Sequence, residues 1–360
     1  MADLSTDDLR AAVAAGVVSE AQAARLLVIS QQRGGFRCNM ADEDEPFELF
    51  KGFSEIFVTV GLALLTSGIV ALSLMLGNPF LLPLVAAGVS ALFASYFTLK
   101  RRMTLPSIFL AGTFGFSVFV FFAIMLGGSA MPDAGSFALV FIATAAALLG
   151  YFRMFRVPFV MFLTGLCGVG LAYSLAGFLL PERFIGESLG GSLAEYLDLG
   201  TSPTLAFTLL GFGLVAFTGA MVFDLRDPHR ISRNAASAFW LHILAAPAIV
   251  NVVVVSLLGI GGASGYLLAA AALAAITIAA LIIDRRSFLT AGIIYIGTIL
   301  TWAISSTDMD TGWGVIWTLL LMGGFITWIG AAWVPLRAAL MRALPDFALK
   351  SKLPPYPEAT

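Results

Sequence analysis

Long apolar stretches, separated by short polar segments, make up most of the sequence after residue 56. A helix that crosses a membrane needs about 20 mostly apolar residues. The stretches reach this length and lack the alternating polarity of a barrel strand. Ten qualify: 57–76, 80–99, 105–126, 134–152, 157–180, 203–223, 235–258, 265–283, 288–306 and 313–334. The pattern therefore predicts an all-α membrane protein with a bundle of ten transmembrane helices over residues 57–336.

Basic residues gather in alternate connections between these stretches. The segments before the first span and after the second, fourth, sixth, eighth and tenth hold 19 of the 20 Lys and Arg residues, and the other connections hold Arg183. The positive-inside rule then places both termini, including the tail 337–360, in the cytoplasm. The split also supports the count, because missing one helix would mix the two sets of segments.

The first 56 residues contain no apolar run of spanning length. Within residues 1–40, Gly16 is expected to end one short helix and Ser19 to cap a second from Glu20 to Arg33. Helices this short need something to pack against. We expect a cytoplasmic helical hairpin that packs on itself or on a cytoplasmic protein partner.

Residues 41–56 combine an acidic run with an amphipathic pattern. Phenylalanines alternate there with charged positions that include Glu48, Lys51 and Glu55. Such a pattern is typical of an interfacial amphipathic helix that leads into the first span. The alternative is a docking face for a soluble partner.

Composition narrows the class of protein further. Of 360 residues, 59% are apolar and 12% are charged, against about 45–50% and about 25% in globular domains. These values exclude a water-soluble fold and intrinsic disorder. A nucleic-acid partner is not expected at a net charge of −2. The expected partner is the lipid bilayer, with anionic lipids at the arginines of the cytoplasmic face.

Two cysteines and two histidines offer little for a disulfide or a metal. Cys38 precedes the first span and Cys167 lies inside one, while His229 and His242 fall in different environments. We therefore expect no disulfide, no metal site and no cofactor.

The seventh span differs from the others because it carries two bulky polar side chains and a proline within its apolar stretch. His242 lies seven residues into it, about 10 Å deep at 1.5 Å per residue. Pro247 removes a backbone hydrogen bond, and Asn251 lies nine positions beyond His242. The functional hypothesis is a polar intramembrane site at these three residues, with His242 as a pH-sensitive group. The alternative is that both side chains bond to neighbouring helices or to the freed carbonyl.

Carboxylates are expected at the ends of spans rather than inside them. Asp224 and Asp284 fall beside arginines at cytoplasmic helix ends, and residues 224–230 have the pattern of a solvated loop with surface ion pairs. A proton-coupled carrier usually keeps a buried carboxylate. The expected lack of one counts against that class and leaves carriers of neutral or lipid-like solutes.

The long connection 181–202 leaves five spans on each side, as in transporters built from inverted repeats. Candidate flexible points at matching places are the small-residue clusters of the first and sixth spans: Thr66, Ser67, Gly68, Thr218 and Gly219. No convincing internal repeat accompanies them.

Two segments carry a resemblance. The run 239–247, Phe-Trp-Leu-His-Ile-Leu-Ala-Ala-Pro, together with Ile283-Asp284-Arg285-Arg286, resembles a group of uncharacterised multipass bacterial inner-membrane proteins. The opening run 16–22 is similar to the cytoplasmic hairpin of predicted bacterial membrane proteins with a domain of unknown function. The resemblance implies a bacterial inner-membrane location, and the family has no established activity to carry over.

Three functions stay open at this point. The first is a transporter-like protein for a small neutral or amphipathic solute, suggested by ten spans and the polar seventh span. The second is a membrane scaffold or sensor that acts through the N-terminal hairpin. The third is an intramembrane enzyme that acts on lipid with His242 as base, which has no evident nucleophile or metal partner.

Overall fold

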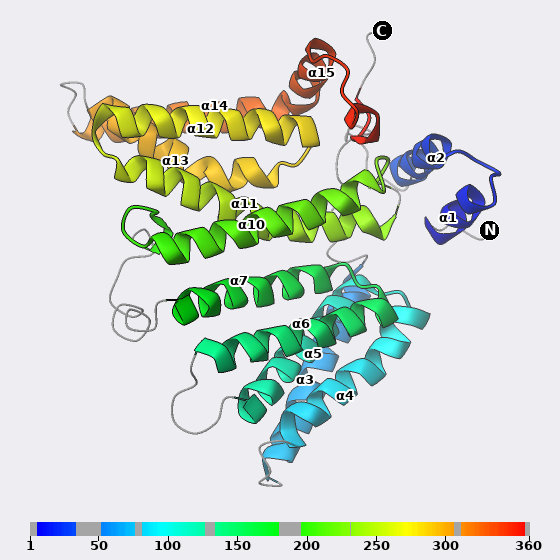
Figure 1. The fold of residues 1–360 in the computed structure, drawn as a ribbon. Helices are drawn as coiled ribbons and strands as arrows, with labels where there is room; N and C mark the ends of the chain where they lie inside the picture. Colours follow the sequence, from blue (N-terminus) through cyan, green and yellow to red (C-terminus); the bar gives the residue numbers. More distant parts are fainter. Residues whose placement is uncertain are drawn as a thin grey trace. The chain divides into compact units, whose positions relative to one another are not determined.

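The structure is a computed structural model, and it describes residues 6–33, 52–75, 81–126, 134–179, 196–230, 232–305 and 311–356. These residues form 13 α-helices and no β-strand. Ten helical segments are long and apolar enough to cross a membrane (Figure 1). The predicted fold class, an all-α protein with ten spans, is confirmed.

The ends of the spans lie close to those expected from hydropathy, and the largest difference is four residues, at Phe53 against 57. The fourth helix, α4, runs without a break into a six-residue π-helix, η1. The spans are α3 (Phe53–Met75), α4 (Leu81–Ala94) with η1 (Ser95–Lys100), α5 (Thr104–Leu126), α6 (Ala134–Phe155), α7 (Phe159–Leu179), α10 (Pro203–Leu225), α11 (Arg233–Gly259), α12 (Gly262–Ile283), α13 (Ser287–Ser305) and α14 (Thr311–Ala331).

Two short helices precede the spans, α1 (Thr6–Ala14) and α2 (Glu20–Arg33). They pack through Leu9 and Ala23, which are both buried. Gly16 adopts a φ of 70° just past α1, the left-handed conformation that favours glycine. Ser19 caps α2 as expected: its Oγ accepts from the N–H of Gln22 at 3.2 Å, and Gln22 Oε1 accepts from the Ser19 N–H at 2.9 Å.

The predicted interfacial helix 41–56 falls mostly outside the described residues. Its last residues belong to α3, so they continue into the first span. Glu55, expected on a polar surface, is buried instead. Its carboxylate accepts from the backbone N–H groups of Thr104 and Leu105 at 3.0–3.1 Å. It thus neutralises two unpaired donors and the positive end of the α5 dipole.

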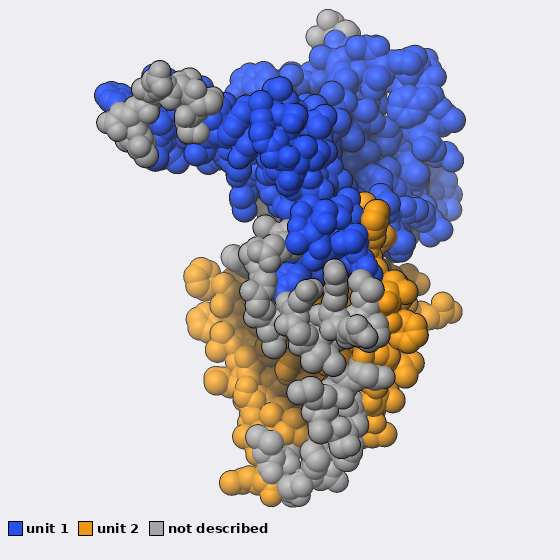
Figure 2. All heavy atoms as spheres, turned by 60° about the vertical axis from the view of Figure 1, so that its left-hand side comes forward, with its two compact units in different colours: residues 1–45, 193–206, 213–360 blue, residues 46–192, 207–212 orange. Residues whose placement is uncertain are grey.

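The chain divides into two compact units (Figure 2). One holds residues 46–192 and 207–212, and the other holds residues 1–45, 193–206 and 213–360. Helix α10 contributes residues to both.

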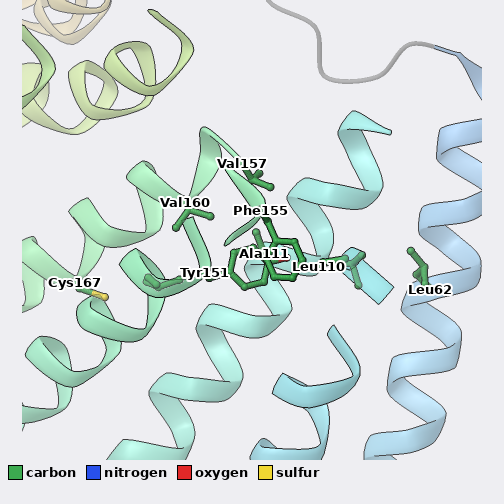
Figure 3. Close-up of a cluster of buried hydrophobic side chains, with 10 residues drawn as sticks. Leu62, Leu110, Ala111, Tyr151, Phe155, Val157, Val160 and Cys167 are labelled. Carbon is green, nitrogen blue, oxygen red and sulfur yellow. The ribbon is translucent and has the colours of Figure 1, made fainter. Parts of the chain in front are cut away.

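The unit with α3 to α7 is built around α5, which packs against the other four helices. Its core is apolar and aromatic (Figure 3). Tyr151 lies between Phe114 and Phe155, with ring centroids 4.6 and 4.4 Å apart. Val160 and Cys167 extend this core along α7.

The other unit has its core among α11, α12 and α13, with α14 packed on α13. A shorter helix, α15 (Trp333–Ala343), follows α14 and packs on α12. Its buried positions are Trp333, Arg337, Ala338 and Met341, which share one face of the helix. After α15 comes the single 3₁₀ turn η2 (Lys350–Lys352).

A polar turn leads into α10. Asp198 accepts from the Thr201 hydroxyl at 2.6 Å and from the Gly200 N–H at 3.0 Å. These hydrogen bonds, that of Thr201 foremost, lower the pKa of the Asp198 carboxyl. The N–H of Leu199 donates to Ser256 of α11, which ties the turn to that helix.

Left-handed residues other than glycine recur at alternate turns between spans. Arg102 follows η1, Arg156 follows α6, Arg230 follows α10 and Asp284 follows α12, all with φ between 51° and 58°. This conformation is uncommon for residues with a Cβ. Each of these turns reverses the chain sharply between two consecutive spans.

Candidate functional site

A cluster of buried ionisable side chains lies where α10 ends. Asp224, in the last turn of α10, faces His242 of α11 and Arg285 of the turn between α12 and α13. Their exposed fractions are 6%, 0% and 2%. No other part of the described chain brings a histidine and a carboxylate together in this way.

The carboxylate of Asp224 is the centre of the cluster. Its Oδ2 accepts from Arg285 Nε at 3.0 Å and lies 2.9 Å from His242 Nε2, and its Oδ1 accepts from Arg285 Nη2. The arginine therefore binds the carboxylate through two nitrogens, the geometry in which such pairs are strongest. An ionised Asp224 can only accept, so a neutral imidazole that bonds to it carries its hydrogen on Nε2.

Aromatic rings enclose the imidazole on its other sides. Phe217 of α10 and Phe288 of α13 approach the His242 ring edge-on, with centroids 5.7 and 5.9 Å away. The same two phenyl rings contact each other at 5.7 Å. The imidazole is thus held in one orientation by a single carboxylate and two apolar rings.

The turn after α12 sets the position of Arg285. Asp284 caps α12 in the left-handed conformation, with φ 58° and ψ 49°. Aspartate tolerates this conformation better than most residues. The reversal turns Arg285 toward α10 and α11, where its Nη2 also approaches the carbonyl of Ala235 at 3.3 Å.

A second set of polar contacts fixes Asp284 itself. Arg230 pairs with its carboxylate at 3.0 Å and donates to its carbonyl at 2.7 Å. Trp333 Nε1 of α15 donates to Asp284 Oδ1 at 2.8 Å. Two left-handed residues, Arg230 and Asp284, therefore join the α10–α11 turn to the α12–α13 turn.

Arg337 joins the C-terminal segment to the same corner. Its guanidinium donates to the carbonyl of Leu281 at 3.1 Å, of Pro355 at 2.8 Å and of Pro354 at 2.5 Å. It also lies 3.8 Å from the Asp284 carboxylate. A buried arginine needs all of these partners, so the segment after η2 is held against the end of α12.

The three residues of the predicted intramembrane site have different surroundings. His242 belongs to the cluster, whereas the Asn251 Oδ1 accepts from the Tyr295 hydroxyl of α13 at 3.0 Å. Pro247 lies between them inside α11, which is continuous from Arg233 to Gly259. The structure therefore assigns His242 and Asn251 to separate contacts along one helix.

The candidate flexible points lie inside unbroken helices. Thr66 donates to the carbonyl of Leu62 at 2.7 Å, and Thr218 donates to that of Leu214 at 2.8 Å. Ser67 and Gly68 belong to α3, and Gly219 belongs to α10. Neither α3 nor α10 is interrupted at these positions.

Asp224, Asp227 and Asp284 correct the interpretation of residues 224–230 as a solvated loop with surface ion pairs. All three are buried. Asp227 accepts from both the N–H and the hydroxyl of Ser232, each at 2.7 Å, ahead of α11. The expectation was wrong because Asp224 and Asp284 have partners far along the chain, and because Asp227 bonds to Ser232, the N-cap residue of α11, instead of facing water.

No protein-family model matches the chain, and neither does any curated protein or solved structure. In the described part of the chain, no group of three His, Cys, Asp or Glu side chains is placed to hold a metal ion.

Sequence reasoning found His242 but missed its partners Asp224 and Arg285, and also Trp333 and Arg337. One signal was present. The two runs that carried the resemblance to inner-membrane proteins, 239–247 and 283–286, hold His242 and Arg285, which meet at Asp224.

Proposed function

We propose that this chain is a membrane transport protein for a small neutral or amphipathic solute. The observation that supports the proposal is the burial of Asp224 and His242, in two membrane-spanning helices, together with Arg285 of the α12–α13 turn. Ionisable groups in such segments are costly, and they mark substrate, ion or proton pathways more often than structural contacts.

Stability alone is a weak reason for such a cluster. Replacing a buried ion pair with apolar residues of similar volume is often neutral or stabilising, because desolvation offsets the attraction. The cluster also answers the objection that the sequence offered no buried carboxylate for a proton-coupled carrier. A proton-coupled carrier needs a buried carboxylate, and Asp224 supplies one beside a histidine.

The proposal includes a place in the cell. We place the protein in the bacterial inner membrane, as its resemblance to multipass proteins of that membrane implies. Both termini are placed in the cytoplasm, because 19 of 20 basic residues fall in alternate connections. The left-handed turns at Arg102, Arg156, Arg230 and Asp284 occupy these same connections. In this orientation the cluster lies toward the cytoplasmic end of its spans.

Solute entry into proteoliposomes tests the proposal. The purified chain is reconstituted, and swelling by stopped-flow light scattering follows a panel of uncharged probes, from urea and glycerol to sugar alcohols, with a pH gradient. We expect at least one probe to enter faster than into protein-free liposomes. Asp224→Asn should slow that entry about tenfold, equivalent to about 1.4 kcal/mol.

The matched control is Asp346→Asn, because the Asp346 side chain is 97% exposed and lies outside the spans, after α15. It should leave entry unchanged. Entry rates equal to those of protein-free liposomes for every probe would exclude the proposed function.

A scaffold or sensor is the second candidate, favoured by the surface of the α1–α2 hairpin. Val17, Leu26 and Ile29 have exposed fractions of 74%, 43% and 52%. Apolar side chains exposed outside the membrane favour a protein partner. Under this alternative, a chain lacking residues 1–33 keeps a folded bundle but loses its cellular role, and full complementation by that chain rules it out.

The third possibility, an enzyme with His242 as base, has no support of its own. The groups around the imidazole are a carboxylate already paired with Arg285 and two phenyl rings. We therefore propose no reaction.

A further inference from the structure

We propose that the Asp224–His242–Arg285 cluster is a proton-binding site in which a proton on His242 displaces Arg285 from Asp224. The inference deepens the proposed transport function by naming the ion that drives it. The binding of the proton is a property of the cluster alone, so it is tested without any solute.

The charges in the cluster make the exchange possible. With a neutral imidazole, Asp224 and Arg285 cancel each other. A proton from water adds to Nδ1, the second ring nitrogen, and converts His242 to an imidazolium whose Nε2–H still points at Asp224 Oδ2. No other covalent bond changes. One carboxylate then faces two cations in an apolar environment, and one of the two cations is in excess.

Arg285 is the cation that can leave. Both cations are buried, but His242 lies inside α11 between Phe217 and Phe288, whereas Arg285 lies in a turn beside the exposed Arg286. Both of its bonds to Asp224 come from a long flexible side chain. A change of side-chain rotamer therefore moves the excess charge toward water, and the imidazolium remains with Asp224.

The other charged groups nearby are already engaged. On the elements packed around His242, α10 presents Asp224, the turn after α12 presents Asp284, Arg285 and Arg286, and α15 presents Arg337. Asp284 is paired with Arg230 and bonded to Trp333, Arg337 binds carbonyls, and Arg286 lies over the Trp333 ring at 5.6 Å. The Phe288 of α13 is uncharged. The group that directly opposes a proton on His242 is thus Arg285.

Arg285 release also changes how the helices are connected. In the observed state it ties the α12–α13 turn to α10 through Asp224 and to α11 through the Ala235 carbonyl. The rotamer change that follows protonation removes both ties, because the same Nη2 bonds Asp224 and the Ala235 carbonyl, while Arg230 and Trp333 continue to hold Asp284. Proton binding therefore favours a state in which α12 and α13 are less firmly tied to α10, a two-state element of the kind that switches need.

Histidine NMR tests the proton site directly. The chain has two histidines, so His229→Gln leaves His242 as the only imidazole of the full-length protein in lipid nanodiscs. Ring-nitrogen shifts report both the tautomer and the protonation. We expect Nε2–H in the neutral state. Asp224→Asn should lower the proton affinity of His242 about tenfold, because the favourable carboxylate is lost.

Removing Arg285, which competes with the imidazolium for Asp224, should raise the proton affinity of His242. Arg285→Met leaves Asp224 free to face the imidazolium, so the proton affinity should rise about tenfold or more. In the Asp224→Asn background the same substitution should have a much smaller effect, because the competition requires the carboxylate. Arg286→Met, on the neighbouring exposed residue, is the matched control and should leave the affinity unchanged.

Two results overturn the inference: a His242 that stays neutral at every pH at which the protein stays folded, or an Arg285→Met variant with unchanged or reduced proton affinity. If Arg285→Met does not fold, Arg285→Lys serves, since a lysine cannot bind the carboxylate through two nitrogens and should still raise the affinity. Transport without pH dependence in the wild type would remove the coupling but not the transport function. A His242 that titrates in a protein that admits no solute would keep the proton site and exclude the transport function.

Discussion

Single side chains fix the ends of helices in this protein. Glu55 is the clearest case, because its carboxylate bonds to two backbone N–H groups at the start of α5, 49 and 50 residues further along the chain. It joins the first turn of α3 to the first turn of α5. A charged acceptor at a helix N-terminus satisfies donors that have no partner inside the helix.

Glu55→Gln should lower the free energy of unfolding by about 1–2 kcal/mol, because the amide accepts fewer bonds and carries no charge. Glu55→Ala should cost more, since both N–H groups then lose their partner. Denaturation of the purified protein in detergent measures the change. Asp346→Asn is the control at a solvent-exposed acid, and equal effects of the two amide substitutions would contradict the capping role.

Whole helices pack through small residues where they come close. Gly170 of α7 lies against the Phe141 ring of α6, so that an added Cβ would overlap the ring. Gly150, at the other end of α6, has nothing within 4 Å of its Cβ position. Gly170 therefore allows α6 and α7 to pack closely, whereas Gly150 makes no contact that a larger side chain would disturb.

Gly170→Ala should destabilise the protein by about 1–3 kcal/mol, because the phenyl ring must move within a packed interface. Gly150→Ala should have the opposite sign and stabilise by up to about 1 kcal/mol, since alanine favours helix. Thermal unfolding followed by helical circular dichroism compares the two. A stabilising Gly170→Ala would show that α6 and α7 pack differently from the structure.

Over the whole molecule, the arrangement of charge predicts one orientation in the membrane. The basic residues and the left-handed turns share the same connections. Two exposed residues report on the two sides. Ile260 lies just past α11, with an exposed fraction of 58%, and Leu349 follows α15, with 48%.

Cysteine labelling checks this orientation. In a Cys38→Ser background, where Cys167 is buried, a membrane-impermeant maleimide should label Ile260→Cys on intact cells. It should label Leu349→Cys only after the membrane is opened. The reversed result would place both termini outside and the ionic cluster toward the outer face.

Hydropathy and local pattern alone predicted the ten spans, the Gly16 stop and the Ser19 cap. Each depends on residues within one turn or one span of each other, so local sequence carries the information. The prediction of a solvated loop at 224–230 failed for the opposite reason. Asp224 and Arg285 are 61 residues apart, and whether they meet depends on which helices pack together.

The tertiary structure alone decided how His242 is used. From the sequence it was a polar residue in a span, with Asn251 as the expected companion. In the packed helices Asn251 bonds to Tyr295, and His242 bonds to Asp224. Apolar periodicity determines which segments enter the membrane, because that transfer depends on each segment's own composition. The pairing of buried charges depends on neighbours that only the folded bundle supplies.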